Sequence, residues 1–362
     1  MATVRRRWAF DALNHLVLTS RLGRKPRSGG YIPIPNGRFL ELLGNPIGPE
    51  VLYEAKRLEI IDCDDEAVVG VQCNGFLITK KALAYGITAL RAPDRIANRL
   101  KESRRLRVEL GVNPALRQLW GTLRKVRLGE GAWEALNTRL EGADMVSALH
   151  SIQSIDAIRR RHWRFCTDEN TGRVFHNVAN CPRVFRPHLT IGGDPTGEAD
   201  IASSQPFFLA ALAYKGEDTI EAKTFRGLAS SERFYETFGE WIGLDETDHD
   251  NLKTRFFQEV LFGRKWFRAK MWEALEARFP RLAEFIDRVK RDDHCALARL
   301  LQQEEARVVI GQIAPILMAR GIETLSIHDG LMARKEHLKE VQSIMTSTIE
   351  RETGNRPLVR IK

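Results

Sequence analysis

The sequence predicts an α+β protein with more than one domain. Its 362 residues exceed the usual size of a single domain. Residues 1–82 are predicted to form two helices and a β-hairpin, whereas the segment 166–362 alternates strands, tight turns and helices. Lys and Arg total 56 against 47 Asp and Glu, which gives a net charge of +9. This charge favours an anionic partner such as nucleic acid.

The predicted N-terminal domain covers residues 1–82. Residues 49–61 place apolar side chains on one helical face, and residues 62–79 predict two strands around an Asn74-Gly75 turn. Helix, helix and hairpin is the order of elements in a winged-helix domain. Lys56 and Arg57 are candidate phosphate contacts, so we expect this domain to bind DNA.

The next predicted region, residues 83–165, is rich in helices and in arginine. Basic helical faces of this kind suit contact with the backbone of a nucleic-acid duplex. The N-terminus lacks the apolar segment of a signal peptide, and no apolar run is long enough for a membrane span. The five cysteines are scattered rather than paired. We therefore expect a reduced, cytoplasmic protein without a membrane partner.

Two aspartates at the ends of predicted strands are the candidate catalytic residues of segment 166–362. One strand ends at Asp200 and leads through a polar turn into an apolar helix, and a second strand, 324–327, leads into a sharp turn at His328, Asp329 and Gly330. Carboxylates from neighbouring strands can share two divalent ions. We expect Asp200 and Asp329 to hold two Mg²⁺ or Mn²⁺ ions.

A basic helix lies between the two aspartates in the sequence. Lys253 and Arg255 stand near its start, and Phe262 and Gly263 follow about two turns later. Cations placed in this way are suited to holding a triphosphate, and an aromatic ring can stack on a base. The sequence leaves open which of the two cations binds the triphosphate.

The order of these segments resembles that of family A polymerases, which include bacterial DNA polymerase I and the single-subunit phage RNA polymerases. The pattern runs from Thr171-Gly172-Arg173 through Asp200 and the Lys-x-Arg helix with its Phe-Gly pair to His328-Asp329, within residues 170–345. The resemblance implies a right-hand polymerase palm with reduced fingers and a helical thumb. Residues 83–165 would form the thumb-like region, and residues 166–362 would form the palm and fingers.

The resemblance also implies a role for each matching residue. Metal ligands would be the carboxylates of Asp200 and Asp329 and the carbonyl of Ile201. Primer or template contacts would be Thr171, Arg173 and His328. The nucleotide-binding residues would be Ser204, Gln205, Lys253, Arg255, Phe262 and Gly263.

Three positions depart from the family pattern. Lys253 stands one residue further from Gly263 than is usual, and Gly330 replaces a glutamate that often follows the His-Asp pair. Gln205 replaces the glutamate that closes off the ribose 2′ side in the DNA polymerases. The choice between DNA and RNA as product therefore stays open.

The resulting prediction is a template-directed nucleotidyltransferase that serves replication of a mobile element. A DNA polymerase with primase activity is the first expectation, and its partners are a DNA primer-template or single-stranded template and nucleoside triphosphates. The alternatives are an RNA polymerase or primase of the same fold and a non-catalytic DNA-binding replication initiator. An HD-type phosphohydrolase is disfavoured, because its ligands normally lie on helices, whereas His328 and Asp329 fall in a β-turn.

Overall fold

The computed structural model describes residues 32–33, 47–64, 75–79, 113–141, 143, 145–244, 249–264 and 269–362. The chain divides into two compact units, Met1–Leu106 with Gly142–Ile152, and Arg107–Glu141 with Gln153–Lys362. Helices and antiparallel sheets occur together, as expected for an α+β protein. The predicted helical region 83–165 contributes to both units, and the predicted domain limits stay predictions.

Within residues 1–106, the described part of the first unit is a helix beside a small antiparallel sheet. Its elements are β1 (Ile32–Pro33), α3 (Ile47–Arg57), β2 (Ile61–Cys63) and β3 (Gly75–Ile78). The strand order is β1-β3-β2, and Ile61 pairs with Ile78. Ala55, Ile61 and Phe76 are buried. The predicted first helix and Asn74 lie outside the described residues.

Six strands form the sheet of the second unit within the described residues, in the order β4-β7-β8-β10-β9, with β11 also pairing with β8. They are β4 (Val126–Leu128), β7 (Leu189–Ile191), β8 (Asp194–Ile201), β9 (Thr324–Ile327), β10 (Gly330–Arg334) and β11 (Val359–Ile361). Strand β8 pairs with β10 along one edge, and its other edge is shared by β7 near its start and β11 near its end. Two further strands, β5 (Phe165–Thr167) and β6 (Val174–His176), form a separate hairpin.

Helix α6 (Pro114–Lys125) shows how local sequence sets an element of this unit. Asn113 caps its start by accepting hydrogen bonds from the backbone N–H groups of Ala115 (2.9 Å) and Leu116 (3.4 Å), and Pro114 occupies the first turn. Its buried side chains pack on β7 and β9. This part of the predicted helical region therefore belongs to the layer that covers the sheet. Helices α7 (Ala132–Leu140) and α8 (Met145–Arg159) follow.

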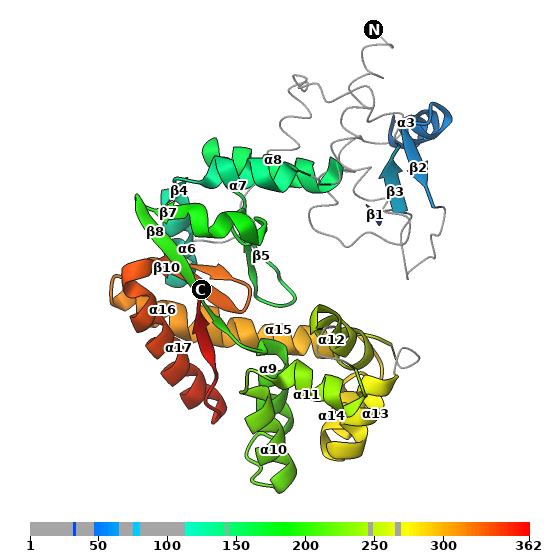
Figure 1. The fold of residues 1–362 in the computed structure, drawn as a ribbon, viewed down its shortest axis with the longest axis vertical. Helices are drawn as coiled ribbons and strands as arrows, with labels where there is room; N and C mark the ends of the chain where they lie inside the picture. Colours follow the sequence, from blue (N-terminus) through cyan, green and yellow to red (C-terminus); the bar gives the residue numbers. More distant parts are fainter. Residues whose placement is uncertain are drawn as a thin grey trace. The chain divides into compact units, whose positions relative to one another are not determined.

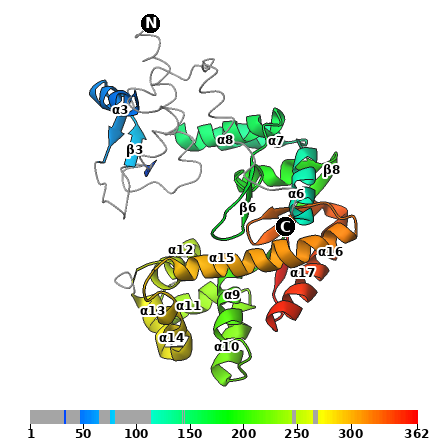
Figure 2. The same ribbon diagram turned by 180° about the vertical axis from the view of Figure 1, so that it is seen from behind.

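Most of the remaining helices continue the second unit. They are α9 (Ser204–Ala213), α10 (Ile220–Ala229), α11 (Phe234–Trp241), α12 (His249–Phe256), α13 (Lys270–Arg278), α14 (Pro280–Val289), α15 (Ala296–Val308), α16 (Ala314–Ala319) and α17 (Leu338–Thr353). A π-helical segment, Phe257–Leu261, extends α12, and another, Val309–Ile313, joins α15 to α16. Helix α9 leaves the end of β8 and packs against α15 (Figures 1 and 2). No helix in the described ranges is long and apolar enough to cross a membrane.

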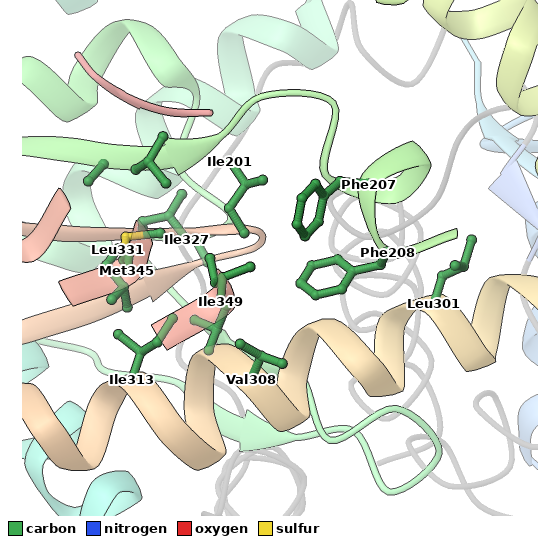
Figure 3. Close-up of a cluster of buried hydrophobic side chains, with 14 of the residues drawn as sticks. Ile201, Phe207, Phe208, Leu301, Val308, Ile313, Ile327, Leu331, Met345 and Ile349 are labelled. Carbon is green, nitrogen blue, oxygen red and sulfur yellow. The ribbon is translucent and has the colours of Figure 1, made fainter. Parts of the chain in front are cut away.

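The core of the second unit lies between the sheet and these helices. Figure 3 shows side chains from the strands, α9, α15 and α17 meeting in one apolar cluster. Phe207, Phe208 and Leu331 are at most 1 % exposed. Each fully buried side chain of this kind contributes roughly 1.5–3 kcal/mol. Because Ile201 belongs to the same cluster, the core anchors the end of β8 that carries Asp200.

Candidate active site

Asp200 and Asp329 are brought together by the pairing of two strands. Asp200 lies near the end of β8 and pairs with Gly330, the first residue of β10. Asp329 directly precedes Gly330 in the turn between β9 and β10, where Ile327 pairs with Gly330. The strand 324–327, the turn and the placement of both aspartates agree with the sequence prediction, except that β8 extends one residue further, to Ile201.

Left-handed backbone flanks both aspartates. Four residues other than glycine have a left-handed φ in the described part of the chain, and two of them are Ser203 (φ 50°) and His328 (φ 53°). Ser203 lies between β8 and α9, and His328 lies in the β9–β10 turn. Such a conformation costs roughly 1–3 kcal/mol per residue and often occurs where function requires it.

Gly330 allows β8 and β10 to approach closely beside Asp200. A Cβ atom at position 330 would lie 2.6 Å from the carbonyl oxygen of Ala199 and 2.8 Å from the Cβ of Asp200. Both distances are far shorter than van der Waals contact. Any side chain at this position would therefore require β8 and β10 to move apart beside Asp200.

The two carboxylates interact electrostatically. Loss of water around Asp329 raises the pKa of its carboxyl, and the negative charge of Asp200 raises it further. The cations of Lys253 and Arg173 act in the opposite direction, which places both near Asp329. The site thus holds two neighbouring acidic groups and two cations within interaction range.

Asp200 offers a carboxylate oxygen suited to a cation. Its Oδ1 atom is buried without a hydrogen-bond partner, and its Oδ2 atom accepts a hydrogen bond from Nζ of Lys362 at 2.5 Å. Hard divalent ions such as Mg²⁺ prefer carboxylate oxygens. The pair Asp200 and Asp329 therefore has the donor chemistry of a divalent metal site, and Ile201 lies next to Asp200 on the same strand.

The two candidate triphosphate ligands have different surroundings. Arg255 donates hydrogen bonds from Nε (3.1 Å) and NH2 (3.0 Å) to the buried Glu259, which also accepts from the backbone N–H of Met271. Lys253 is exposed on α12, with Nζ 5.6 Å from the ring centre of Phe257, and its charge acts on Asp329. The geometry favours Lys253 for a ligand near the carboxylates and gives Arg255 a structural role.

Aromatic rings lie around this part of the site. Phe262 packs against Phe257 with ring centres 5.1 Å apart, and the carbonyl oxygen of Gly263 accepts a hydrogen bond from Nζ of Lys290 at 2.6 Å. Tyr235 of α11 is buried and hydrogen-bonded to the side chain of Ser203. Burial raises the pKa of the Tyr235 hydroxyl, and the negative charge of Asp329 adds to this rise, so Tyr235 also lies close to the carboxylates.

The β5–β6 hairpin positions Thr171 and Arg173. The Thr171 hydroxyl donates to the Asp168 carboxylate at 2.7 Å, which orders the turn. Arg173 donates from Nε (2.9 Å) and NH2 (2.6 Å) to Oε1 of Glu305 on α15. The structure therefore joins the Thr-Gly-Arg segment to a helix that lies 132 residues further along the chain.

Glu305 is the residue of this site that the sequence analysis missed. Its side chain is 1 % exposed. Its Oε2 atom accepts hydrogen bonds from Oγ of Ser204 (3.1 Å) and Nε2 of Gln205 (2.9 Å). Burial raises the pKa of its carboxyl to about 7, because the cation of Arg173 offsets only part of the lost hydration.

A signal for Glu305 was present in the helical periodicity. Leu297, Leu301 and Val308 are all buried on α15, and Glu305 falls on the same face, four residues after Leu301. A glutamate on an apolar helical face needs polar partners when it is buried. Its periodicity therefore marked Glu305 as a candidate, although it could not identify the partners.

His328 lies beside a group of arginines. Protein atoms around its ring and the charges of Arg186, Arg173 and Arg183 lower the pKa of the imidazole to about 4, although the residue as a whole is exposed. The imidazole is also hydrogen-bonded to the backbone of Ala179. A neutral imidazole and several cations at the β9–β10 turn make this edge of the site suitable for an anionic ligand.

The predicted DNA contacts Lys56 and Arg57 lie on α3 of the first unit. Both residues are exposed, and Arg57 forms an ion pair with Glu54 at 2.9 Å. Among the described residues, one group of three side chains has metal-binding atoms within 4.8 Å of one another, namely Asp293, His294 and Cys295. In that group the Asp293 carboxylate pairs with Arg299 and accepts a hydrogen bond from the backbone N–H of Cys295, which is a structural role.

No protein-family model matches the chain, and no curated protein matches it. Among solved structures, the fold is similar to the POL domain of Pol1 from M. smegmatis in complex with DNA primer-template and dNTP, with a TM-score of 0.47 and 12 % sequence identity. The similarity covers 59 % of this chain and 50 % of that chain, so this chain spans about half of that protein's length. The similarity concerns backbone shape, and the activity has to be argued from the site.

Proposed function

We propose that this protein is a template-directed nucleotidyltransferase whose active site is built on Asp200 and Asp329. The observation that carries the proposal is the pairing of Asp200 with Gly330, which brings Asp200 next to Asp329. The buried Oδ1 atom of Asp200, which has no hydrogen-bond partner, supports it. A DNA polymerase with primase activity is the first candidate, and an RNA polymerase or primase is the second.

The proposed reaction joins the 3′-oxygen of a growing strand to the α-phosphorus of a nucleoside triphosphate and releases pyrophosphate. Asp200 and Asp329, with the carbonyl of Ile201, would hold two divalent ions. When bound, such ions activate the hydroxyl and neutralise the triphosphate. Lys253 contributes a further positive charge to the triphosphate, and no covalent enzyme intermediate is required.

Other parts of the chain would hold the nucleic acid. We assign strand contacts to Thr171, Arg173 and His328, and stacking on the base to Phe262 next to Gly263. Lys56 and Arg57 would contact phosphates through the N-terminal domain. The net charge of +9 and the arginines around His328 support an anionic partner. We propose in addition that this activity serves the replication of a mobile element.

Extension of a labelled primer on a DNA template tests the proposal. The reactions contain Mg²⁺ or Mn²⁺ with deoxyribonucleotides or ribonucleotides, and parallel reactions omit the primer. Asp200→Asn and Asp329→Asn should each lower the rate by about a hundredfold or more, because each removes a charge that holds the ions.

Asp194→Asn is the matched control, because Asp194 lies on the same strand but is exposed and pairs with Arg334 at 3.3 Å. It should retain activity. Turnover retained in both active-site variants would contradict the assignment of these aspartates. Absence of extension in every reaction, with DNA binding intact, would favour a non-catalytic DNA-binding initiator.

A further inference from the structure

Lys362 places a positive charge on one of the two proposed metal ligands. Its Nζ atom donates a hydrogen bond to Oδ2 of Asp200 at 2.5 Å. Lys362 follows β11, the strand that pairs with β8 on the edge away from β10. The ammonium group therefore reaches Asp200 from β11, whereas Asp329 comes from the β9–β10 turn.

The backbone of Lys362 is fixed by strand pairing. Its N–H donates to the carbonyl oxygen of Glu198 at 2.8 Å, and the N–H of Glu198 donates to the carbonyl oxygen of Lys362 at 3.1 Å. Arg360 pairs with Asp200 in the same register, so Lys362 is a diagonal neighbour of Asp200 on one face of the sheet. Diagonal neighbours lie within reach of a long side chain. The sheet thus holds the backbone, and the flexible side chain alone decides where the ammonium group lies.

The carboxylate directly opposite Lys362 has a different partner. Glu198 forms an ion pair with Arg186, in which NH1 and Oε2 are 3.3 Å apart, and both side chains are largely buried. Lys362 therefore does not pair with the acidic residue that faces it directly. It pairs with Asp200, two residues further along β8. The contact is thus directed at the proposed metal ligand rather than at the nearest acidic residue.

This ion pair can open without any change in the sheet. The side chain of Lys362 is 53 % exposed, and that of Asp200 is 22 % exposed. An ion pair at the protein surface contributes little stability, because water solvates both groups once they separate. A divalent ion carries twice the charge and binds carboxylate oxygens directly. Such an ion can therefore replace the ammonium group while the backbone of Lys362 stays paired.

An ammonium group and a divalent ion on the same carboxylate oxygen repel each other. Mg²⁺ lies about 2.1 Å from its ligand oxygens. The ammonium nitrogen of Lys362 lies 2.5 Å from Oδ2 of Asp200. Two like charges this close to one oxygen atom would be only a few ångströms apart. An ion that binds there must displace Lys362, and the lost ion pair weakens the affinity of the site for that ion.

We propose that Lys362 is an internal cation at Asp200, which competes with the divalent ion and is displaced when the ion binds. This inference rests on the proposed function, because it concerns the metal ligands of that active site. In the metal-free protein Lys362 keeps the Asp200 carboxylate paired. At low concentrations of divalent ion the lysine pair predominates, and at high concentrations the ammonium group moves into solvent.

Binding of Mn²⁺ to the whole protein, measured without nucleotide or DNA by electron paramagnetic resonance of the free ion, tests the competition. Lys362→Met removes the ammonium group and keeps an unbranched side chain, so it should tighten Mn²⁺ binding about fivefold. Lys362→Arg keeps a cation that can pair with Asp200 and should stay within about twofold of the wild type.

Lys223→Met is the matched control. Lys223 also forms an exposed ion pair with an aspartate, Asp218, at 2.9 Å, so its substitution removes the same charge and the same kind of contact. The Mn²⁺ affinity of this variant should equal that of the wild type. Equal affinities of the wild type and Lys362→Met, or equal tightening in Lys223→Met and Lys362→Met, would contradict the inference.

Asp200→Asn separates direct competition from a general effect of charge. Without the carboxylate, Lys362→Met should no longer tighten the remaining Mn²⁺ binding. A tightening that persists in the Asp200→Asn background would show that Lys362 acts elsewhere.

Amine labelling follows the displacement itself. An ammonium group that donates to a carboxylate reacts slowly with acetic anhydride, because the reagent requires a free amine. Saturating Mg²⁺ should therefore raise the acetylation of Lys362 several-fold, as read by mass spectrometry, and should leave that of Lys223 unchanged. Acetylation of Lys362 that does not respond to Mg²⁺ would overturn the displacement.

The outcomes separate this inference from the proposed function. Tighter Mn²⁺ binding in Lys362→Met without primer extension by any of the proteins would support the internal cation and contradict the polymerase. Primer extension by the wild type, with a Mn²⁺ affinity that does not depend on Lys362, would overturn the inference and leave the polymerase intact. If neither the wild type nor Lys362→Met binds Mn²⁺, the inference is wrong, and so is the assignment of the metal ligands.

Discussion

At the scale of single residues, the geometry of the candidate site depends on close backbone packing as well as on charged side chains. Gly330 carries no functional group, yet its missing side chain allows Ala199 and Asp200 to lie directly against β10. Asp329 follows a left-handed His328, and α9 begins after a left-handed Ser203. Adding one methyl group at Gly330 is therefore expected to affect activity as well as stability.

Gly330→Ala should lower both activity and stability. The new Cβ would lie 2.6 Å from the Ala199 carbonyl oxygen, so β8 and β10 must separate at Asp200. We expect a loss of about 1–3 kcal/mol in the free energy of unfolding, measured by urea denaturation, and a larger loss in primer extension.

Gly227→Ala serves as the control for that substitution. Gly227 lies within α10, and a Cβ there would meet no atom within 4 Å. This change should be neutral or stabilising by up to about 1 kcal/mol. Full activity in Gly330→Ala would show that the close approach is unnecessary.

At the scale of elements, α12 carries a residue with a structural role close to one that is proposed to bind the triphosphate. Arg255 and Glu259 form an i, i+4 ion pair that joins the π-helical segment to the start of α13 through Met271. Lys253, two residues earlier, is exposed and acts on Asp329. The same helix thus places one cation inside a structural network and another beside the carboxylates.

Lys253→Gln and Arg255→Gln should have separable effects. The first should raise KM for the nucleoside triphosphate about tenfold or more at unchanged thermal stability, because it removes a charge-assisted contact. The second should leave the buried Glu259 without its cation and lower the free energy of unfolding by about 1–3 kcal/mol. Steady-state kinetics and urea denaturation of both variants check this, and reversed phenotypes would exchange the two assignments.

Sequence patterns predicted the elements that are local and missed the contacts that are not. The strand 324–327, the turn holding Asp329 and the apolar helix after Asp200 follow from alternation and turn residues within short windows. The partners of Glu305 lie about 100 and 132 residues away, and their contact depends on how α15 packs against α9. A sequence pattern that spans a few helical turns cannot show which residues so far apart in the chain come into contact. The Arg255–Glu259 pair has the i, i+4 spacing of a helical ion pair, but the sequence analysis considered Arg255 only as a triphosphate ligand.

At the scale of the whole molecule, one buried histidine links the β5–β6 hairpin to the main sheet. His176 is fully buried; its Nε2 donates to the carbonyl oxygen of Ser326 on β9 (2.9 Å), and its Nδ1 accepts from the N–H of Ala179 (3.2 Å). Burial lowers the pKa of the imidazole to about 4. The hairpin that carries Arg173 is thus attached through a group that must stay neutral.

This histidine should make the protein less stable in mild acid. Its folded-state pKa lies below its unfolded value of about 6.5, so the unfolded chain binds the proton first as the pH falls. The contribution of neutral His176 to the free energy of unfolding is fully present above about pH 6.5. It is lost progressively as the pH falls from there to about pH 4. At about pH 5 the loss should be about 2 kcal/mol relative to neutral pH.

Urea denaturation of the wild-type protein and His176→Gln at several pH values measures this contribution. The difference between the two proteins cancels the effect of other groups, among them Glu305, whose raised pKa acts with the opposite sign. The advantage of the wild type should shrink by that amount between about pH 7.5 and pH 5. A difference that does not depend on pH would show that His176 is not a titrating link.

The pairing of β8 with β10 has a consequence for how this protein can change in length. Five consecutive residue pairs, from Asp200 with Gly330 to Thr196 with Arg334, fix the register. Because side chains alternate between the two faces of a strand, deleting one residue from β8 would turn Asp200 toward the opposite face while leaving the composition almost untouched. The number of residues between the β7–β8 turn and Asp200 is therefore part of the proposed catalytic geometry. An insertion or deletion of an odd number of residues there would disrupt it, whatever its size.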